Sequence, residues 1–270
     1  MSDAATTYWA HSENDAGVRE TLAEHLREVA RLAGEFAEAF GAGPQAEAAG
    51  LLHDLGKYGE RFQRRLEDPS VRAGDHWTAG ALTALQYLKE AGMAPALAIL
   101  GHHGGLPAHI PHRNPRTMVG TIGKAFLKSD YLATSKDLPE LLDRWKNDGL
   151  QLPNASPAIA AHEYERLRYA ATMLDVRMLF STLVDADFLA TEAHFSGDAE
   201  NPRRLRPSGP PLDCDRAIES LEAYRRKVKT THGSHPMAGL REQLYANCVE
   251  AAACDPGGFT LSAPTGSGKT

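Results

Sequence analysis

The sequence predicts an all-α fold, and three observations favour it. Apolar residues recur at three- and four-residue steps through most of the chain. The alternation of β-branched and polar residues that is typical of strands is nearly absent. The 270 residues, 42% of them hydrophobic and 24% charged, have the composition of a globular chain that is long enough to bury a sizeable core.

The first helix is expected over residues 18–40, where Leu22, Val29 and Phe36 share one face and a glycine–proline segment ends the pattern. Asp75 has the residue type and position of an N-cap for the third helix. The other helical patterns cover residues 45–57, 75–91, 94–103, 116–134, 139–147, 157–193, 213–229 and 236–254. The pattern over 157–193 is long enough to contain one break.

Three regions are expected along the chain. Residues 1–196 form the main helical domain, and residues 197–235 form a linker, rich in proline and glycine at its start, with a terminal helix. Residues 236–270 begin a second domain, in which a short strand over 259–261 leads into a glycine-rich turn. Because this is an unusual place for a natural chain to finish, we expect the sequence to be excised from a longer protein.

Charge and cysteine content exclude several classes of protein. The net charge of −6 excludes a generally basic nucleic-acid-binding surface, although it leaves room for a local basic groove. Three cysteines without a C-x-x-C motif cannot build a disulfide framework, which fits a reduced, cytoplasmic setting. The chain has neither a signal peptide at its start nor an apolar run of the roughly 18–20 residues that span a bilayer, so no membrane association is expected.

Histidines and aspartates recur at the helical segments. The His53-Asp54 pair lies between leucines, so it is expected in the core or in a cleft. A buried carboxylate is costly unless it is paired or bound to a metal ion, and imidazole and carboxylate are ordinary ligands of divalent transition metals. His25 lies on the apolar face of the first helix, and His76 stands at a helix start. The tandem His102-His103 closes a helix.

Two further carboxylates, Asp185 and Asp187, lie in an apolar helical stretch. Residues two apart on a helix point to different faces, so at most one of them shares a site with the histidines. Each of these residues alone has a structural interpretation as a core, capping or surface group. Together they indicate a metal site built from facing helices of a bundle.

The order of these residues resembles the HD phosphohydrolase superfamily. The single histidine followed by a tandem pair resembles the nuclease domain of the CRISPR-associated helicase–nuclease of type I CRISPR systems. The matching strings are Trp9–Ser12, His53–Lys57, His102–Gly105 and Asp185–Glu192. The resemblance covers about residues 8–195, and then 237–270 as the start of a helicase. It implies an HD-domain helical bundle with a dinuclear metal site, followed by a truncated helicase beginning.

The resemblance also implies the ligand sets of two divalent ions bridged by Asp54. One ion would be held by His25, His53, Asp54 and Asp187, and the other by Asp54, His76, His102 and His103. Asp187 is preferred because Ala186-Asp187-Phe188 fits the family pattern, while Asp185 stays possible. His11 is expected to be structural or to support the ligands from behind.

Two ions about 3.5–4 Å apart would clamp a phosphodiester and activate a water, with Asp54 and Lys57 as the catalytic residues. Lys57 follows Asp54 by three residues and is assigned to a phosphate or leaving oxygen. The histidine-rich set favours Mn, Fe, Co or Ni over Mg, which remains possible, and zinc is not excluded on affinity.

A local basic groove for single-stranded DNA is expected near this site. Trp77 or Tyr58 is available for stacking on a base. The basic residues are Arg61, Arg64, Arg65, Arg113, Arg116, Lys124 and Lys128.

The end of the chain predicts a truncated Walker A loop for nucleotide binding, in which Lys269 would reach the phosphates and Thr270 would ligate Mg²⁺. Its residues are Ala263, Pro264, Thr265, Gly266, Ser267, Gly268, Lys269 and Thr270. Since the following helix and a Walker B aspartate are missing, ATP and Mg are expected only in a full-length protein, and no ATPase activity is expected from this chain.

The resemblance implies a metal-dependent endonuclease or exonuclease that cleaves single-stranded DNA in CRISPR antiviral interference. Such a nuclease is recruited to a CRISPR surveillance (Cascade-type) ribonucleoprotein complex and coupled to an ATP-dependent helicase. Two alternatives stay open: an HD phosphohydrolase that acts on nucleotides, and a non-catalytic binding module with structural histidines.

Overall fold

The computed structural model describes residues 6–72, 74–106, 120, 124, 138–154, 165–207, 209–232, 235–255 and 260–264. The chain divides into two compact units, Met1–Arg206 and Pro207–Thr270, which are treated separately below. The regular secondary structure of the described residues is helical, and their one β-type pairing is an isolated bridge between Trp9 and Thr21. The expected all-α class is therefore confirmed for the described part of the chain.

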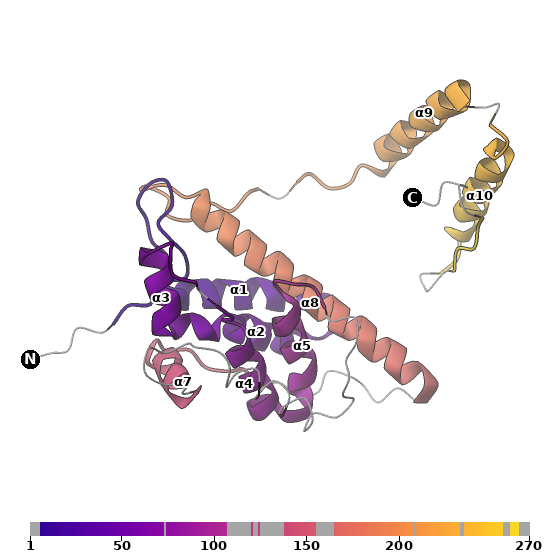
Figure 1. Ribbon diagram of the computed structural model, residues 1–270. Helices are drawn as coiled ribbons and strands as arrows, with labels where there is room; N and C mark the ends of the chain where they lie inside the picture. Colours follow the sequence, from indigo (N-terminus) through magenta and orange to yellow (C-terminus); the bar gives the residue numbers. More distant parts are fainter. Residues whose placement is uncertain are drawn as a thin grey trace, which may run out of the picture. The chain divides into compact units, whose positions relative to one another are not determined.

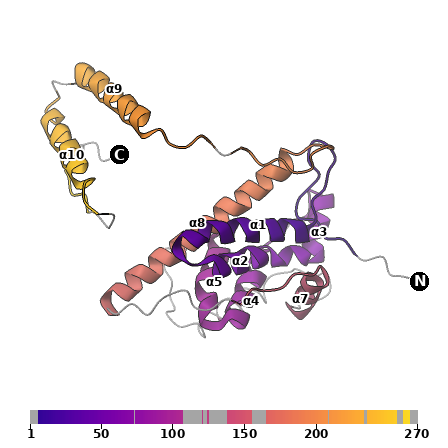
Figure 2. The same ribbon diagram turned by 180° about the vertical axis from the view of Figure 1, so that it is seen from behind.

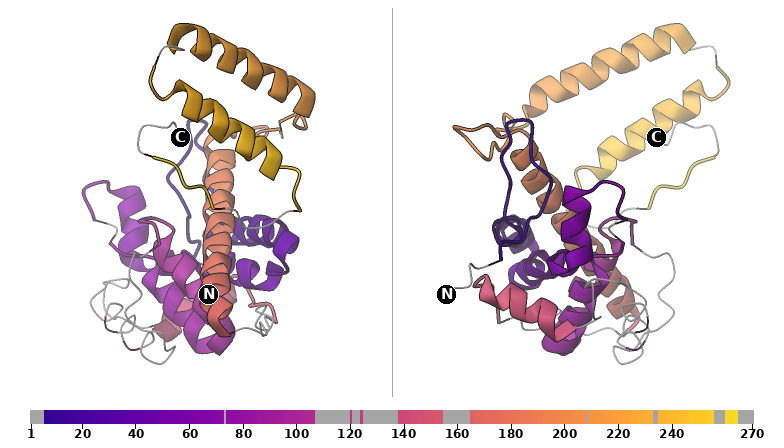
Figure 3. Two further views of the ribbon diagram at one scale, coloured as in Figure 1. Left: turned by 90° about the vertical axis from the view of Figure 1, so that its right-hand side faces the viewer. Right: turned by 60° about the vertical axis from the view of Figure 1, so that its left-hand side comes forward.

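The first unit is a helical bundle crossed by one long helix (Figures 1 and 2). Its α-helices are α1 (Leu22–Ala37), α2 (Gly43–Leu52), α3 (Glu60–Glu67), α4 (Thr78–Leu88), α5 (Met93–Gly101), α7 (Leu138–Asn147) and α8 (Glu165–Phe195). Short 3₁₀ turns are η1 (Glu38–Phe40), η2 (Leu55–Tyr58) and η3 (Lys89–Gly92). Helix α8 packs against α1, α2 and α5, and Figure 3 shows it lying along the bundle.

Helix α1 begins at a complete capping box. The Thr21 side chain accepts the main-chain N–H of Glu24, and the Glu24 carboxylate accepts the main-chain N–H of Thr21. The buried stripe of α1 includes Leu22, His25 and Val29, at the three- and four-residue steps expected of a core-facing helix. The cap therefore fixes His25 one turn into the helix and facing the core.

Two glycines let the helices approach closely. A Cβ on Gly50 of α2 would lie 2.5 Å from the Cα of Ala30 in α1, and a Cβ on Gly80 of α4 would overlap the main-chain oxygen of Leu52. These contacts are possible only without a side chain at both positions. They bring the end of α2, where His53 and Asp54 follow, against both neighbouring helices.

Residues 6–21, here called the N-terminal strap, cross the first unit before α1. Trp9 exchanges two 3.0 Å hydrogen bonds with the side chain of Gln63 in α3. Asn14 donates from Nδ2 to the main-chain oxygen of His194 near the end of α8. The strap thus connects α3 and α8 across the edge of the bundle.

Several helix boundaries differ from the sequence prediction. The predicted helix 45–57 ends at Leu52, and His53 and Asp54 form the turn before η2. The 75–91 helix begins only at Thr78, because Asp75 accepts the main-chain N–H groups of Trp77 and Thr78 from outside the helix. The 94–103 helix ends at Gly101, so the tandem histidines follow it.

Helix α3 was absent from the prediction because Phe62 is its one buried residue and gives no periodic signal. The 139–147 helix corresponds to α7, and α8 runs unbroken over Glu165–Phe195. The predicted helix 116–134 lies outside the described residues, apart from positions 120 and 124, which are helical.

The second unit contains α9 (Cys214–His232) and α10 (Ala238–Ala251), where two helices were expected. Arg225 of α9 lies 3.3 Å from the ring centroid of Tyr245 in α10 and pairs with Glu242. The strand expected over 259–261 is wrong for its described part, since Thr260 and Leu261 have no strand partner among the described residues.

Residues 197–207 and 209–213 carry no helix, as expected of a linker. No helix within the described segments combines the length and the apolar character that crossing a bilayer requires.

Candidate metal centre

Asp54 lies at the centre of a cluster of imidazoles and carboxylates. Its side chain is 2% exposed, and its two oxygens face different groups of residues. Oδ2 lies 3.2 Å from His53 Nε2 and 3.7 Å from His25 Nε2. Oδ1 lies 3.5 Å from His76 Nε2 and 3.8 Å from His102 Nε2. One carboxylate therefore joins two sets of ligand atoms.

The first set, here called the inner group, consists of His25, His53, Asp54 and Asp187. Asp187 Oδ1 lies 3.3 Å from His25 Nε2 and 3.6 Å from His53 Nε2. Both histidines are fully buried, because α1 and the end of α2 enclose them together with α8. The inner group thus joins α1 and the turn after α2 to α8, which lies more than 100 residues further along the chain.

The second set, here called the outer group, consists of Asp54, His76, His102 and His103. One nitrogen or oxygen from each of the four lies within 4.8 Å of the others, and His76 Nε2 lies 2.8 Å from His103 Nε2. His103 is exposed, and His76 stands on the non-helical segment before α4. The outer group is therefore the side of the cluster that opens to solvent.

Main-chain carbonyls orient three of these imidazoles. The Nδ1 atom lies 2.8 Å from Gly50 O in His53, 2.7 Å from Ile99 O in His102 and 3.3 Å from Gly74 O in His76. A carbonyl can only accept, so each Nδ1 carries the proton and donates it. The Nε2 atoms are left directed at Asp54, which is how second-shell contacts prepare histidines to bind a metal.

The atoms that face the centre fit a divalent cation. Nε2 of His25, His53 and His102, together with Asp54 Oδ1, are buried and make no hydrogen bond among the described residues. An unpaired buried polar group costs about 1–3 kcal/mol, so several in one place need a ligand. Imidazole nitrogens and carboxylate oxygens around one point are the donor set of Mn, Fe, Co, Ni or Zn.

Electrostatics within the inner group favour charge pairs. Burial by itself would lower the pKa of His53, but the carboxylates of Asp54 and Asp187 outweigh it and raise that pKa to about 10. Burial opposes ionisation of Asp54, yet His53 and Lys57 hold its pKa well below the ordinary value. In the absence of a metal ion, the protonated His53 therefore supplies positive charge beside Asp54 and Asp187.

The opposite holds for the outer histidines. Burial lowers the pKa of His76, and burial together with the neighbouring His102 lowers the pKa of His103 to about 4. Both imidazoles are neutral at pH 7 and present lone pairs, which is the form that binds a metal.

Lys57 lies beside the cluster. Its Nζ is 2.7 Å from Asp54 Oδ2 and donates to the main-chain oxygen of Ala10 in the N-terminal strap (3.1 Å). These contacts use two of its three N–H groups. Its side chain is 7% exposed, so it is a component of the site rather than a surface lysine.

Other predicted residues have different surroundings. Asp185 is exposed, whereas Asp187 faces the inner group, so the geometry favours Asp187. His11 packs edge-on against the His25 ring at 4.7 Å between centroids. Burial, reinforced by the positive charge of Lys57, lowers the pKa of His11 to about 2.

The expectation that Tyr58 stacks on a base is wrong, because its ring is fully buried and its hydroxyl donates to Asp148. Trp77 is half-buried, and its ring lies 5.0 Å from that of His76 and 5.1 Å from that of His103. It therefore borders the outer group.

The basic residues and the nucleotide loop are described only in part. Arg61 donates to the main-chain oxygen of Arg72, Arg64 is exposed and Arg65 is half-buried on α3. Lys124 is exposed, while residues 113, 116 and 128 lie outside the described part. Of the predicted nucleotide-binding residues, Ala263 and Pro264 are described and non-helical, and residues 265–270 lie outside.

One residue of the site escaped the sequence prediction. Glu20 is 3% exposed, and its Oε2 lies 3.6 Å from His25 Nδ1. It belongs to no motif, and a carboxylate just before a helix is usually a capping residue. Only the fold reveals it behind a predicted ligand.

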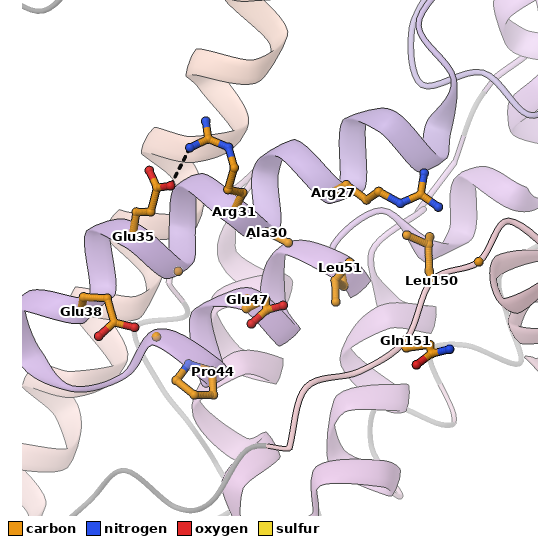
Figure 4. A pocket seen from close by; sticks show the side chains of 13 residues that line it. Arg27, Ala30, Arg31, Glu35, Glu38, Pro44, Glu47, Leu51, Leu150 and Gln151 are labelled. Carbon is orange, nitrogen blue, oxygen red and sulfur yellow. Dashed lines mark hydrogen bonds and ion pairs between the residues drawn. The ribbon is translucent and has the colours of Figure 1, made fainter.

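A hollow of about 590 Å³ lies elsewhere in the first unit, between α1, α2 and residues 149–151 (Figure 4). Arg31 and Glu35, paired at 2.7 Å, stand at its edge. No residue predicted to bind a metal lines this hollow. It is therefore separate from the cluster.

Residues 22–143 match the HD domain family. No curated protein matches the chain. HD domains are metal-dependent hydrolases that bind divalent ions, and His25, His53, Asp54, His76, His102 and His103 lie within the matched residues. Asp187 lies beyond them and joins the cluster through the fold.

Proposed function

We propose that this HD domain is a nuclease that cleaves single-stranded DNA with two divalent transition-metal ions. One observation carries the proposal: Asp54 offers one oxygen to each of two ligand groups. A carboxylate shared between two sets of imidazoles is suited to a pair of ions, which is the arrangement that phosphodiester hydrolysis uses.

The inner and outer groups would each hold one ion, bridged by Asp54. When bound, the two ions would supply Lewis acidity to the phosphate oxygens and make a water acidic enough to attack phosphorus. Asp54 keeps the two groups in register, because its side chain is fixed on one side by Lys57. Lys57 has an N–H left to donate to a phosphate or leaving oxygen, where it would offset developing negative charge.

The opening of the site supports a polymeric anionic substrate. The outer group reaches solvent at His103, and Trp77 lies against that ring. Arg64 and Arg65 on α3 belong to the same unit and would contact the phosphates of a bound strand. We propose that Trp77, rather than the buried Tyr58, borders the first exposed nucleotide.

We further propose a setting in type I CRISPR interference. The ordered strings His53–Lys57 and His102–Gly105 support it, as does the Walker A-type sequence that closes the chain. In the full-length protein the nuclease would receive DNA from an ATP-dependent helicase and act on a target held by a CRISPR surveillance complex in the cytoplasm.

One assay series tests the activity. The purified chain is stripped of metal, loaded with Mn²⁺, Co²⁺ or Ni²⁺, and offered circular single-stranded DNA, duplex DNA and nucleotides. Metal-dependent loss of the circular single strand is the expected result, with Asp54→Ala as the inactive control. A circle also reveals endonuclease action, because an exonuclease cannot begin on it.

Two results would contradict the proposal. Phosphate release from nucleotides with intact DNA would favour a nucleotide phosphohydrolase. Absence of turnover with every metal and substrate would favour a non-catalytic module.

A further inference from the structure

His25 differs from the other buried histidines of the cluster in what lies behind it. The Nδ1 atoms of His53 and His102 face main-chain carbonyls. The Nδ1 of His25 faces a side-chain carboxylate, Glu20 Oε2, at 3.6 Å. Both atoms are buried, and neither makes a hydrogen bond among the described residues.

The α-helix explains why His25 needs a different partner. Residue 25 lies in the first full turn of α1, where the main-chain oxygen of Thr21 already accepts the N–H of His25 itself. The carbonyls beside a helical side chain already accept main-chain N–H groups, and an ionised carboxylate is a stronger acceptor than such a carbonyl. His53 and His102 follow helix ends, where Gly50 O and Ile99 O lie within hydrogen-bond distance of Nδ1.

The position of Glu20 is itself held from the other side. Arg203, in the segment that follows α8, pairs with Oε1 of Glu20, so Oε2 is the oxygen left for the histidines. The main-chain oxygen of Glu20 accepts from Ala10, which ties residue 20 to the N-terminal strap. His11 Nε2 lies 3.8 Å from the same Oε2, so this oxygen serves two imidazoles.

We propose that Glu20 is a positioning residue for the inner metal ion: its Oε2 accepts the Nδ1 proton of His25 and so keeps Nε2 free to bind the metal. A carboxylate behind a ligand histidine orients the ring and raises its basicity. This inference rests on the proposed metal centre and adds the residue that completes it.

Metal binding to the full chain tests the inference without relying on activity. Co²⁺ is titrated into the metal-free protein, followed by calorimetry and by visible absorption. In the wild type we expect two binding events. In Glu20→Gln we expect one of them to weaken by about 10–100-fold and its absorption band to change, while the other stays within about twofold.

Three control variants separate positioning from general loosening. Glu13→Gln makes the same change at an exposed carboxylate of the strap. Asn14→Ala removes an anchor of the strap to α8. Glu20→Gln combined with Arg203→Met removes the guanidinium that the first substitution leaves without its carboxylate. We expect both single controls to bind Co²⁺ as the wild type does, and the double variant to stay as weak as Glu20→Gln.

The outcomes distinguish this inference from the proposed function. If the wild type binds no Co²⁺, the metal centre itself is refuted, and the inference falls with it. If the wild type binds two ions and Glu20→Gln has unchanged affinity and spectrum, only the inference is overturned. Recovery of affinity in the double variant, or an equal loss in Asn14→Ala, also overturns it, because either result indicates a merely structural effect.

Discussion

The inner and outer groups share Asp54 but are built in different ways. The inner histidines, His25 and His53, are completely enclosed by packed helices. The outer histidines, His76 and His103, stand on non-helical segments, and His103 is exposed. Enclosure favours an ion that is held tightly and exchanged slowly, whereas an open position admits water and substrate. The comparison indicates that the inner group is built to retain its ion, and the outer group is built to admit substrate and water.

The largest expected effect comes from removing the residue that the two groups share. Asp54→Ala should lower cleavage of single-stranded DNA by at least about 10³-fold, because both ions lose a ligand and transition-state charge loses its stabilisation. Initial rates at saturating Mn²⁺ measure the effect. Asp185→Ala is the matched control, since Asp185 is exposed on the helix that carries Asp187. Comparable losses of cleavage rate in both variants would contradict the bridging role of Asp54.

Metal removal should have the next largest effect. Ions that bind only the folded state stabilise it by about 2.7 kcal/mol at a free concentration of 100 times Kd. For a unit of this size that corresponds to roughly 5–10 °C in Tm. Calorimetry with and without a chelator measures the shift, and re-addition of Mn²⁺ should reverse it. A Tm that chelation leaves unchanged would contradict metal binding by either group.

Single ligand deletions sharpen the contrast between the groups. In the metal-free protein, His25→Ala should cost about 1–3 kcal/mol of unfolding free energy, because it leaves a cavity in the packed core. His103→Ala should change the unfolding free energy by less than about 0.5 kcal/mol, since the ring is exposed. Urea unfolding measures both values.

Metal content provides the second measurement for the same pair. Each variant should retain about one ion fewer than the wild type, and His102→Ala should behave likewise. Equal stability losses in His25→Ala and His103→Ala would show that the two groups do not differ in enclosure. Unchanged stoichiometry would exclude the substituted residue as a ligand.

A further expected effect is a pH dependence of opposite sign in the two groups of the metal-free protein. The raised pKa of His53, about 10, gives stability that is complete below the ordinary value of 6.5 and lost as pH rises toward 10. The lowered pKa of His103, about 4, gives stability that is lost as pH falls from 6.5 toward 4, because the unfolded chain takes up the proton first. Stability should therefore be greatest near pH 6.5.

Urea midpoints between pH 4.5 and 9.5 test this shape. His53→Gln should flatten the stability curve on its alkaline side. His103→Gln should reduce the loss on the acid side only in part, because His11 and His76 also have lowered pKa values. Asp54 and Asp187 do not interfere, because carboxylates with lowered pKa values affect stability only near and below their ordinary value of 3.8. If His103→Gln loses as much stability below pH 6.5 as the wild type does, His103 does not contribute to that loss.

The helical class could be predicted because apolar periodicity is strong wherever a helix faces the core. The periodicity did not predict α3, where Phe62 alone is buried. It also extended the second predicted helix past His53, because leucines on both sides continue the apolar pattern beyond the end of α2. The strand expected over 259–261 rested on local apolar character, whereas a strand exists only with a partner.

The cluster could be predicted because histidine and aspartate carry their chemistry in the residue type. The structure brings together the seven side chains that the resemblance implied, and whether each binds a metal stays a prediction. Glu20 could not be found, since its role depends on the distance to His25 and not on any local pattern. Tyr58 shows the reverse error: an aromatic residue near a motif was given a role that its burial excludes.

The contacts at Gly50 and Gly80 have a consequence for engineering this protein. Main chain rests on main chain there, so the spacing of α1, α2 and α4 is set by backbone thickness rather than by adjustable side chains. Gly50 fixes the spacing of α1, which carries His25, and α2, which leads into His53, whereas Gly80 fixes the spacing of α2 and α4, which His76 precedes. A designer who wishes to enlarge the inner group would therefore begin with an alanine at Gly50, and one who wishes to move His76 away from Asp54 would begin with an alanine at Gly80.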